Sequence, residues 1–283
     1  MFFFNRKKLI EEFEKRKKEK GEEKELEKRR KKEEAEKDFI FACRNGYTDD
    51  VKDLLKNKQM NPNCLDNKGQ TPLYVASCDG RESIVKLLLK NKRVDVNAGN
   101  TEGLTPLWIA CRKLRIGALK LLLNHENIDV NRADSNGETP LHISCRKGRL
   151  GVMKLLLKNE NVDINQVNNV GETPFHVSCE YGKSEALKLL LNHQKDGVGR
   201  LALNHQVPLE EVNEVKLLTS EGRIVNKLNN NGQTPIYIAC QNNWIDVVKV
   251  LLSDPQLDAN KGNTEDETPL YVACYFGFFE VAE

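Results

Sequence analysis

The chain has 283 residues, of which 39% are hydrophobic and 30% are charged, a balance that suits a protein with a buried core and excludes a fully disordered one. The formal net charge is +2, and the basic excess lies in residues 6–37, which hold 15 Lys/Arg and 11 Glu. The remainder of the chain is nearly neutral, which argues against nucleic acid as a partner. No apolar run approaches the roughly 18 residues of a membrane span, so a membrane partner is not expected either.

Residues 1–36 form an arm in which Glu and Lys/Arg alternate. Glu11 and Lys15, like Glu25 and Arg29, stand four residues apart, a spacing that brings opposite charges together on a helix. The few apolar residues follow no heptad, so a packed coiled coil is not predicted. We therefore expect a charged arm that is a solvated, partly formed helix or is disordered, and the alternative role is contact with an anionic partner.

A repeated phrase fills the rest of the chain. Thr-Pro followed by an apolar residue recurs with a constant period of about 34 residues, a length typical of stacked helical repeats. The interval between Thr173 and Thr234 is longer, and it corresponds to one period plus an insertion near 195–221. A degenerate copy lies one period before the first regular copy, with Lys37 in place of the threonine. The regular copies begin at Thr71, Thr105, Thr139, Thr173, Thr234 and Thr268.

Each unit predicts a helix, a turn, a second helix and a long loop. In the first regular copy, Thr71 suits an N-cap, Pro72 suits the first helical position, and Gly80 supplies a left-handed residue that ends a helix. The loop carries Asp-x-Asn and then Gly, residue types that favour turns. The second helix has an apolar stripe at Ile84, Val85, Leu88 and Leu89.

This pattern closely resembles the ankyrin repeat. The shared features are the TPLxxA/S phrase, the helix-ending Gly, the VKLLL run and the D-x-N-x5-G loop. The resemblance implies an all-α ankyrin-repeat solenoid, in which helix-turn-helix units with hairpin loops stack into a curved array. It also implies that the concave side, formed by the first helices and the hairpin tips, binds partner proteins.

The predicted organisation is a charged N-terminal arm, residues 1–36, followed by an ankyrin-repeat domain, residues 37–283. Leu114 and Asn243 replace the helix-ending Gly, and the histidine of the motif remains only at His142 and His176; we expect these changes to alter local packing without loss of the fold. The repeats are expected near 37–70, 71–104, 105–138, 139–172, 173–233, 234–267 and, truncated, 268–283.

The eight cysteines do not predict disulfides or a zinc site. Six of them share one position of the repeat, where a small side chain lets two helices approach each other. Equivalent positions in adjacent repeats are expected about 10 Å apart, too far for a disulfide, and no pair has a zinc-ligand spacing. Free thiols are therefore expected, as in a reducing compartment, at Cys43, Cys111, Cys145, Cys179, Cys240 and Cys274.

No catalytic arrangement can be assembled from the sequence. His142 and His176 predict hydrogen bonds at the start of their helices rather than catalysis. The nearest approach to a phosphate-binding loop is Gly182-Lys183-Ser184, but Val177 stands where that loop needs an upstream Gly. We therefore predict no enzymatic activity, no cofactor, no metal and no small-molecule substrate.

The ends of two consecutive first helices carry the same basic pattern. These residues predict a surface for an acidic partner segment, and the alternative is that the charges only confer solubility. Trp108 and Trp244 are counted with them as candidate partner contacts. We name this pattern the basic stripe; it comprises Arg112, Lys113, Arg115, Arg146, Lys147 and Arg149.

Two segments depart from the regular repeat pattern. The insertion near 195–221 has an amphipathic pattern after Pro208, which predicts a short helix that packs on its own repeat or contacts a partner. The last unit stops soon after Gly277, before a complete second helix, and aromatic residues crowd it. We expect this end to be incomplete or unstable, or else buried against a second molecule.

We interpret the protein as a non-catalytic interaction scaffold or adaptor. The alternative is the recognition segment of a larger enzyme, of the kinase or ubiquitin-ligase type, whose catalytic part is absent from this sequence. The expected partner is a protein, with an acidic segment if the basic stripe is functional. A monomer in the cytoplasm, or in the nucleus, is expected.

Overall fold

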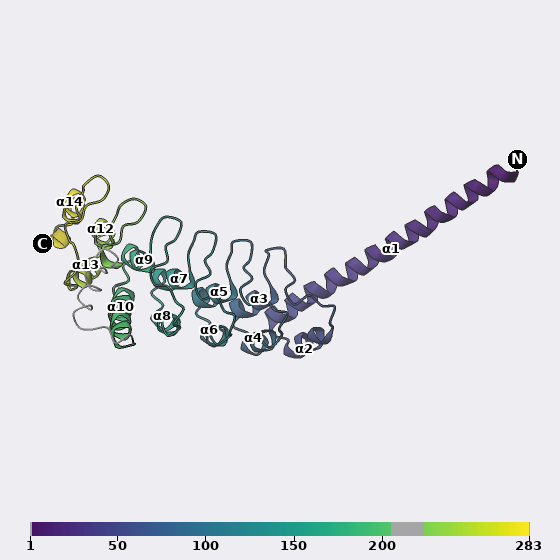
Figure 1. Cartoon of the computed structure of the whole chain (residues 1–283), viewed down its shortest axis with the longest axis horizontal. Helices are drawn as coiled ribbons and strands as arrows, with labels where there is room; N and C mark the ends of the chain where they lie inside the picture. Colours follow the sequence, from purple (N-terminus) through teal and green to yellow (C-terminus); the bar gives the residue numbers. More distant parts are fainter. Residues whose placement is uncertain (1, 205–223, 283) are drawn as a thin grey trace.

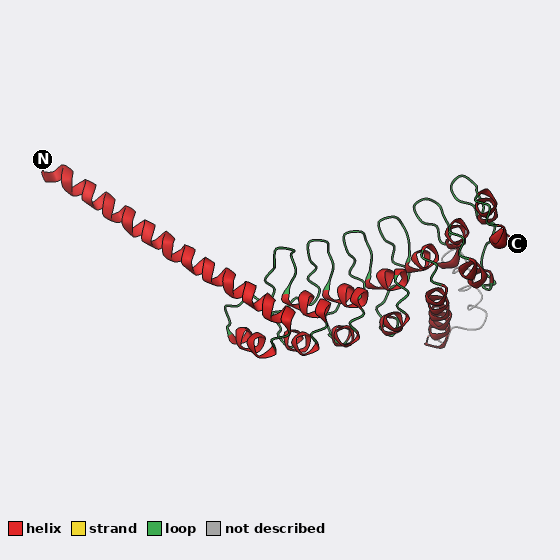
Figure 2. Ribbon diagram, turned by 180° about the vertical axis from the view of Figure 1, so that it is seen from behind, coloured by secondary structure: helices red, strands yellow, loops and turns green. Residues whose placement is uncertain are grey.

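The computed structural model describes residues 2–204 and 224–282, and it describes side chains for 17–19, 21–194 and 224–282. The chain forms one long helix followed by a row of stacked helix pairs, from which hairpin loops project on one side (Figure 1). The row curves toward the side of the hairpin loops, and the described residues contain helices and loops but no strand (Figure 2). The expectation of an all-α solenoid is confirmed.

Two rows of helices build the array. The long helix α1, Phe2–Asn45, ends as the first member of the inner row. The inner row continues with α3 (Pro72–Asp79), α5 (Pro106–Lys113), α7 (Pro140–Arg146), α9 (Pro174–Glu180), α12 (Pro235–Gln241) and α14 (Pro269–Tyr275). The outer row consists of α2 (Thr48–Lys56), α4 (Glu82–Leu89), α6 (Ile116–Leu123), α8 (Leu150–Leu156), α10 (Ser184–Asn204), α13 (Ile245–Leu252) and α15 (Phe279–Ala282), and a short 3-10 helix, η1 (Ile224–Asn226), precedes α12.

The inner helices begin as the Thr-Pro phrase predicts. The hydroxyl oxygen of Thr71 accepts a hydrogen bond from the backbone N–H of Tyr74 at 3.1 Å, and Pro72 occupies the first helical position. The same threonine cap starts each of the other five regular inner helices. Each cap satisfies one of the backbone donors that a helix start leaves without a partner.

The inner helices end at a left-handed residue. Gly80 has a φ of 71°, and Leu114 takes the same conformation with a φ of 58°. A leucine is strained there because its Cβ approaches the carbonyl oxygen, and the residue is 44% exposed, so packing offsets little of that strain. The fold therefore imposes the turn on a residue that does not favour it.

We expect Leu114→Gly to stabilise the protein by about 0.5 kcal/mol, because relief of the left-handed strain exceeds the extra entropy of glycine in the unfolded chain. The matched control is Gly148→Ala, which places a Cβ at a φ of 61° and should lose about 1 kcal/mol. Urea unfolding followed by circular dichroism measures both variants. A loss of stability in both would show that the turn at Leu114 is not strained.

One continuous hydrophobic core runs through the array. On the outer helix α4, Ile84, Val85 and Leu88 are fully buried, as the predicted stripe requires. The inner helices from α3 to α12 are buried on nearly all sides, because each packs between its own outer helix and the inner helices of both neighbours. The core extends without a gap from Phe39 to Ala273, so each helix pair depends on the next for burial.

The hairpin loops are joined by a ladder of asparagine side chains. The side chain of Asn97 donates from Nδ2 to the carbonyl of Asn127 at 2.7 Å and accepts at Oδ1 from the backbone N–H of Asp129 at 2.9 Å. Asn131 makes the same pair of bonds to the following loop, to the carbonyl of Asn161 and the N–H of Asp163. The Asn of the repeated Asp-x-Asn phrase thus connects one loop to the next.

The arm and the first repeat share one helix. α1 continues without a break past residue 36, and Phe39 and Cys43 in its last turns are fully buried against the array. The side chains of 21–34 are exposed, and Glu27 and Lys31 form an ion pair at 2.7 Å, one of the four-residue spacings on which the sequence pattern relies. The short helix expected after Pro208 lies outside the described residues.

The repeat-position cysteines form a buried row with one exposed member. Burial raises the pKa of the Cys111 and Cys145 thiols to about 12, and it raises the pKa of Cys179 well above its usual value. Cys274 is exposed. Because the thiolate is the reactive form, the buried members are inert while the fold is intact.

We expect iodoacetamide at neutral pH to label Cys274 first in the native protein, and to leave Cys111, Cys145 and Cys179 unlabelled. All eight cysteines should react after denaturation without a reductant. Peptide mass spectrometry gives the labelling of each residue. Two or more cysteines that resist labelling in denaturant until a reductant is added would reveal disulfides and contradict the assignment of free thiols.

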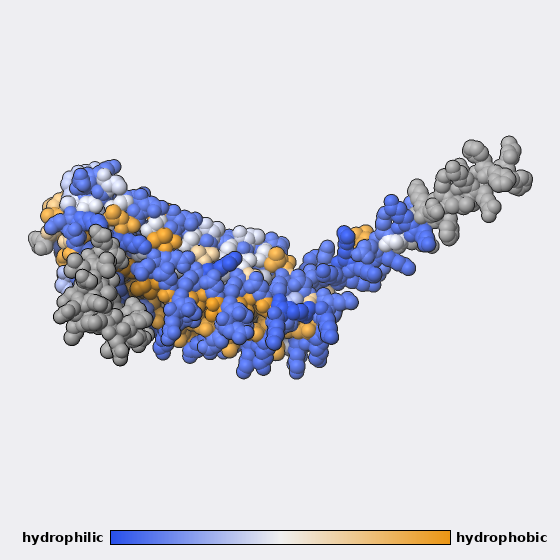
Figure 3. Space-filling model, in the orientation of Figure 1, coloured by the Kyte–Doolittle hydropathy of each residue, from blue (hydrophilic) through white to orange (hydrophobic). Residues whose placement is uncertain are grey.

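The C-terminal unit exposes large apolar side chains. Leu270 and Tyr271 are exposed on α14, although the equivalent Ile236 and Tyr237 of the preceding unit are buried. Tyr275 and Phe279 are exposed as well, and hydrophobic residues reach the surface at this end of the array, as they do in a band along its middle (Figure 3). The aromatic crowding expected from the sequence is present, and α15 spans only four residues.

Candidate protein-interaction surface

The basic stripe lies on two adjacent helix pairs. Residues 105–125 carry four Lys/Arg and residues 139–159 carry five, and neither segment contains Asp or Glu. The six residues of the stripe occupy the ends of the inner helices and the turns to the outer helices, where Arg115 and Arg149 are the N-cap residues of α6 and α8. Such a surface is cationic over two neighbouring repeats.

Two members of the stripe are engaged within the array. Nε of Arg115 donates to the carbonyl of Cys78 at 2.9 Å, which satisfies a last-turn carbonyl of the preceding inner helix. Arg146 forms an ion pair with Glu138, and its guanidinium lies 5.1 Å from the centre of the Tyr181 ring in the next repeat. Both arginines therefore hold repeats together, a role that the basic pattern alone does not reveal.

The other four members are exposed, and none of them forms an ion pair in the described part of the chain. The guanidinium of Arg112 stands 5.6 Å from the centre of the Trp108 ring. We call Arg112, Lys113, Lys147 and Arg149 the free basic patch. Because these charges have no ion-pair partner within the described protein, an external anion can bind them without first displacing an acidic side chain.

The two tryptophans have different environments. Trp108 is only 4% exposed, and its Nε1 donates to the carbonyl of Glu138 at 3.0 Å in the next hairpin loop. Trp244 is 41% exposed at the turn before α13, and its Nε1 donates to the carbonyl of Glu180 at 2.9 Å. The Trp108 indole ties α5 to the hairpin loop at the far end of its own unit, whereas the Trp244 indole bridges two repeats and keeps the larger surface for a partner.

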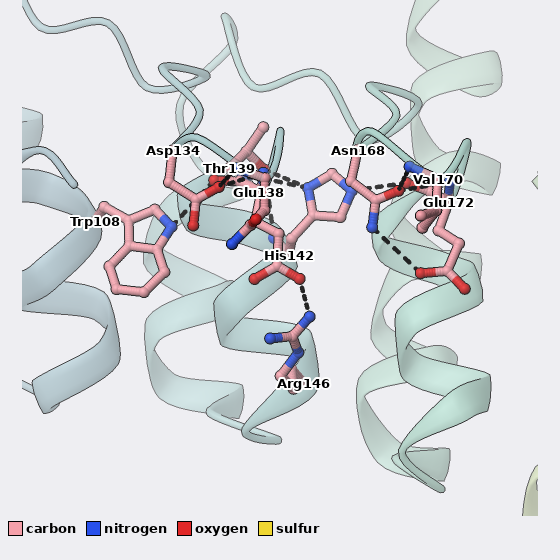
Figure 4. Close-up of polar contacts among 10 residues, drawn as sticks. Trp108, Asp134, Glu138, Thr139, His142, Arg146, Asn168, Val170 and Glu172 are labelled. Atoms are coloured by element: carbon pink, nitrogen blue, oxygen red, sulfur yellow. Dashed lines mark hydrogen bonds and ion pairs between the residues drawn. The ribbon is translucent and has the colours of Figure 1, made fainter. Parts of the chain in front are cut away.

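A row of hydrogen-bonded polar side chains, which we call the floor, runs across neighbouring repeats (Figure 4). Nε2 of His142 is 2.9 Å from the carbonyl of Glu172, and Nδ1 is 3.2 Å from the backbone nitrogen of Thr139. Because a carbonyl oxygen only accepts, Nε2 carries the proton and Nδ1 accepts. Burial lowers the pKa of His142 and lowers that of His176 to about 4, so both rings are neutral, and each ties the start of its inner helix to the hairpin loop at the far end of the same unit.

A cleft of about 220 Å³ opens beside this floor. One wall carries Arg112, Arg146 and Lys147 from the ends of α5 and α7. The hairpin loops supply the opposite wall. The lining residues on that side and on the floor are Glu102, Leu104, Trp108, Asp134, Asn136, Glu138 and Ile143.

Sequence reasoning did not find Glu138 and Tyr181, which hold Arg146. The repeat register offers a signal for the Glu138–Arg146 pair, because the two positions carry complementary polar side chains in more than one unit. Gln233 and Gln241 occupy the same two positions, and their side chains are hydrogen bonded at 3.4 Å. Within the described residues, His, Cys, Asp and Glu side chains form no group of three that could hold a metal ion. None of the helices described is both long enough and apolar enough to cross a membrane.

Comparison with known proteins gives a family match and a structural match. A family model described as ankyrin repeats, in three copies, matches residues 39–134, 94–168, 117–200 and 203–283. The crystal structure of the ankyrin repeat domain of Bcl-3, a member of the IkappaB protein family, resembles this one with a TM-score of 0.67. The two sequences are 22% identical over 83% of this chain and 92% of that one, so the likeness is one of fold. No curated protein sequence matches.

Proposed function

This chain belongs to the ankyrin repeat family, and on that premise we propose that it is a non-catalytic scaffold or adaptor that binds a partner protein along its repeat array. The array offers an extended curved surface of inner helices and hairpin loops, which suits a macromolecular partner better than a small molecule. Its eight cysteines, none of which forms a disulfide, agree with the cytoplasm or the nucleus.

The free basic patch is the observation that supports a partner with an acidic segment. Four cations on two adjacent repeats have no ion-pair partner among the described residues, and the helix pairs that carry them contain no acidic residue. Such a patch favours an acidic segment of the partner and speeds its association through long-range attraction. The engaged residues Arg115 and Arg146 contribute by keeping the two repeats in place.

The test is a variant with Glu at all four positions of the free basic patch. Partners captured by the parent protein are identified by mass spectrometry, purified, and measured for association rate against salt concentration. We expect the variant to associate about tenfold more slowly at low salt, and to lose most of its salt dependence.

The matched control replaces Lys52, Lys58, Lys68 and Lys90 by Glu, because these are four exposed lysines of the first two repeats without an ion pair in the described structure. This control should leave the association rate within about twofold of the parent. Equal rates for the parent and the four-residue variant, at every salt concentration, would return the patch to a role in solubility.

A further inference from the structure

The cleft between α5 and α7 divides the free basic patch into two classes. Arg112 and Lys147 line the cleft, whereas Lys113 and Arg149 lie outside it. The four residues are all exposed and carry the same charge, so a diffuse electrostatic surface would use all of them alike. A site for a single anion would depend on the two in the cleft.

Arg112 is arranged to receive a carboxylate. Its guanidinium lies 5.6 Å from the centre of the Trp108 ring, within the range of a cation–π contact, and none of its N–H groups has a hydrogen-bond or ion-pair partner in the described structure. The indole is itself held by its bond to the carbonyl of Glu138, so the ring is a fixed support. Arginine in this setting can offer two parallel donors to one carboxylate.

The acidic side chains of the cleft are not equal competitors for these cations. The Asp134 carboxylate accepts hydrogen bonds from the backbone N–H groups of Asn136 and Glu138, at 2.9 and 2.8 Å, and so serves the hairpin turn. Glu138 is buried and paired with Arg146. Only Glu102, on the hairpin side, is exposed and makes no side-chain ion pair in the described structure.

We propose that this cleft anchors one Asp or Glu side chain of the partner's acidic segment, with its carboxylate bound by Arg112 and Lys147. The inference rests on the proposed function, and it adds a defined subsite to it. The aliphatic part of the incoming side chain packs toward Leu104 and Ile143, and the carboxylate faces the basic wall. Glu102 on the far wall repels the carboxylate and limits its affinity.

The probe is a fluorescein-labelled peptide of about ten residues in which Glu and Gly alternate, and binding is followed by fluorescence anisotropy at about 0.05 M salt. We expect Arg112→Gln and Lys147→Gln each to weaken binding roughly fivefold to tenfold, because each removes a charged hydrogen bond. Lys113→Gln and Arg149→Gln are matched controls with the same loss of charge, and they should weaken binding less than about twofold. Glu102→Gln should strengthen it about twofold. Circular dichroism confirms that each variant is folded.

Equal losses in all four basic variants would overturn the anchor and leave the proposed function intact, because a diffuse patch still attracts an acidic partner. If the peptide does not bind the parent protein, the anchor is also overturned. The proposed function would stand in that case, because the association of captured partners with the free basic patch is measured independently. A second peptide has phosphoserine in place of each Glu. If it alone binds, with the same dependence on Arg112 and Lys147, the cleft is a phosphate site and the carboxylate assignment is wrong.

Discussion

Between about pH 7 and pH 4.5, the protein is expected to lose roughly 2 to 3 kcal/mol of stability through His176 alone. Burial lowers the pKa of this ring from 6.5 to about 4, although the carbonyl of Lys227, 2.8 Å from Nε2, acts in the opposite direction. Nδ1 is 3.3 Å from the backbone nitrogen of Thr173, which donates to it. If the ring took up a second proton, Nδ1 would become a donor and could no longer accept the hydrogen bond from Thr173.

The direction follows from proton binding. Below pH 6.5 the unfolded chain takes up a proton at His176 that the folded protein does not take up until the pH is near 4. The unfolded state is therefore favoured progressively as the pH falls through this interval. The contribution of His176 is complete above pH 6.5 and is lost as the pH approaches the folded-state pKa of about 4.

Urea unfolding of the parent and of His176→Gln, at several pH values in this interval, measures the effect. The variant should be less stable at neutral pH, because the glutamine does not reproduce both bonds of the ring. Its stability should also fall less steeply toward low pH. Parallel curves for the two proteins would show that His176 does not titrate as its burial predicts.

Asn131→Ala is expected to cost about 2 kcal/mol, because it removes both hydrogen bonds that join its loop to the next one. The loss falls in the middle of the array, where the hairpin loops on both sides rely on the same ladder. We expect faster hydrogen exchange in the loop that contains Asn161 and Asp163 than in the parent protein. Urea unfolding gives the free energy, and exchange followed by mass spectrometry locates the change.

Asn260→Ala is the matched control, because Asn260 holds the same place in the Asp-x-Asn phrase of a later unit. In the described structure no hairpin loop follows that unit, and the exposed side chain of Asn260 makes no ladder bond. This variant should change stability by less than about 0.5 kcal/mol. Similar costs for both substitutions would mean that the ladder bonds add nothing to stability.

Much of this fold could be predicted because its signals are local and repeated. A threonine cap, a proline in the first turn and a left-handed residue at the end act within one helix, so Thr71, Pro72 and Gly80 predict that helix without reference to the rest of the chain. Repetition of the phrase at a fixed period then predicts stacking, because a single helix pair cannot bury its own apolar face.

The sequence by itself determined the family, the helix starts, the apolar stripes, the cysteine row and the two basic repeats. Only the tertiary structure decided which charges are free, because the partners of Arg115, Arg146 and Trp108 come from neighbouring repeats or from the far end of the same unit. It also decided that α1 runs unbroken into the array, and that Arg112 and Lys147 share a cleft. The physical reason is that these contacts depend on how the repeats stack, and side-chain charge and spacing along the chain do not specify which groups that stacking brings together.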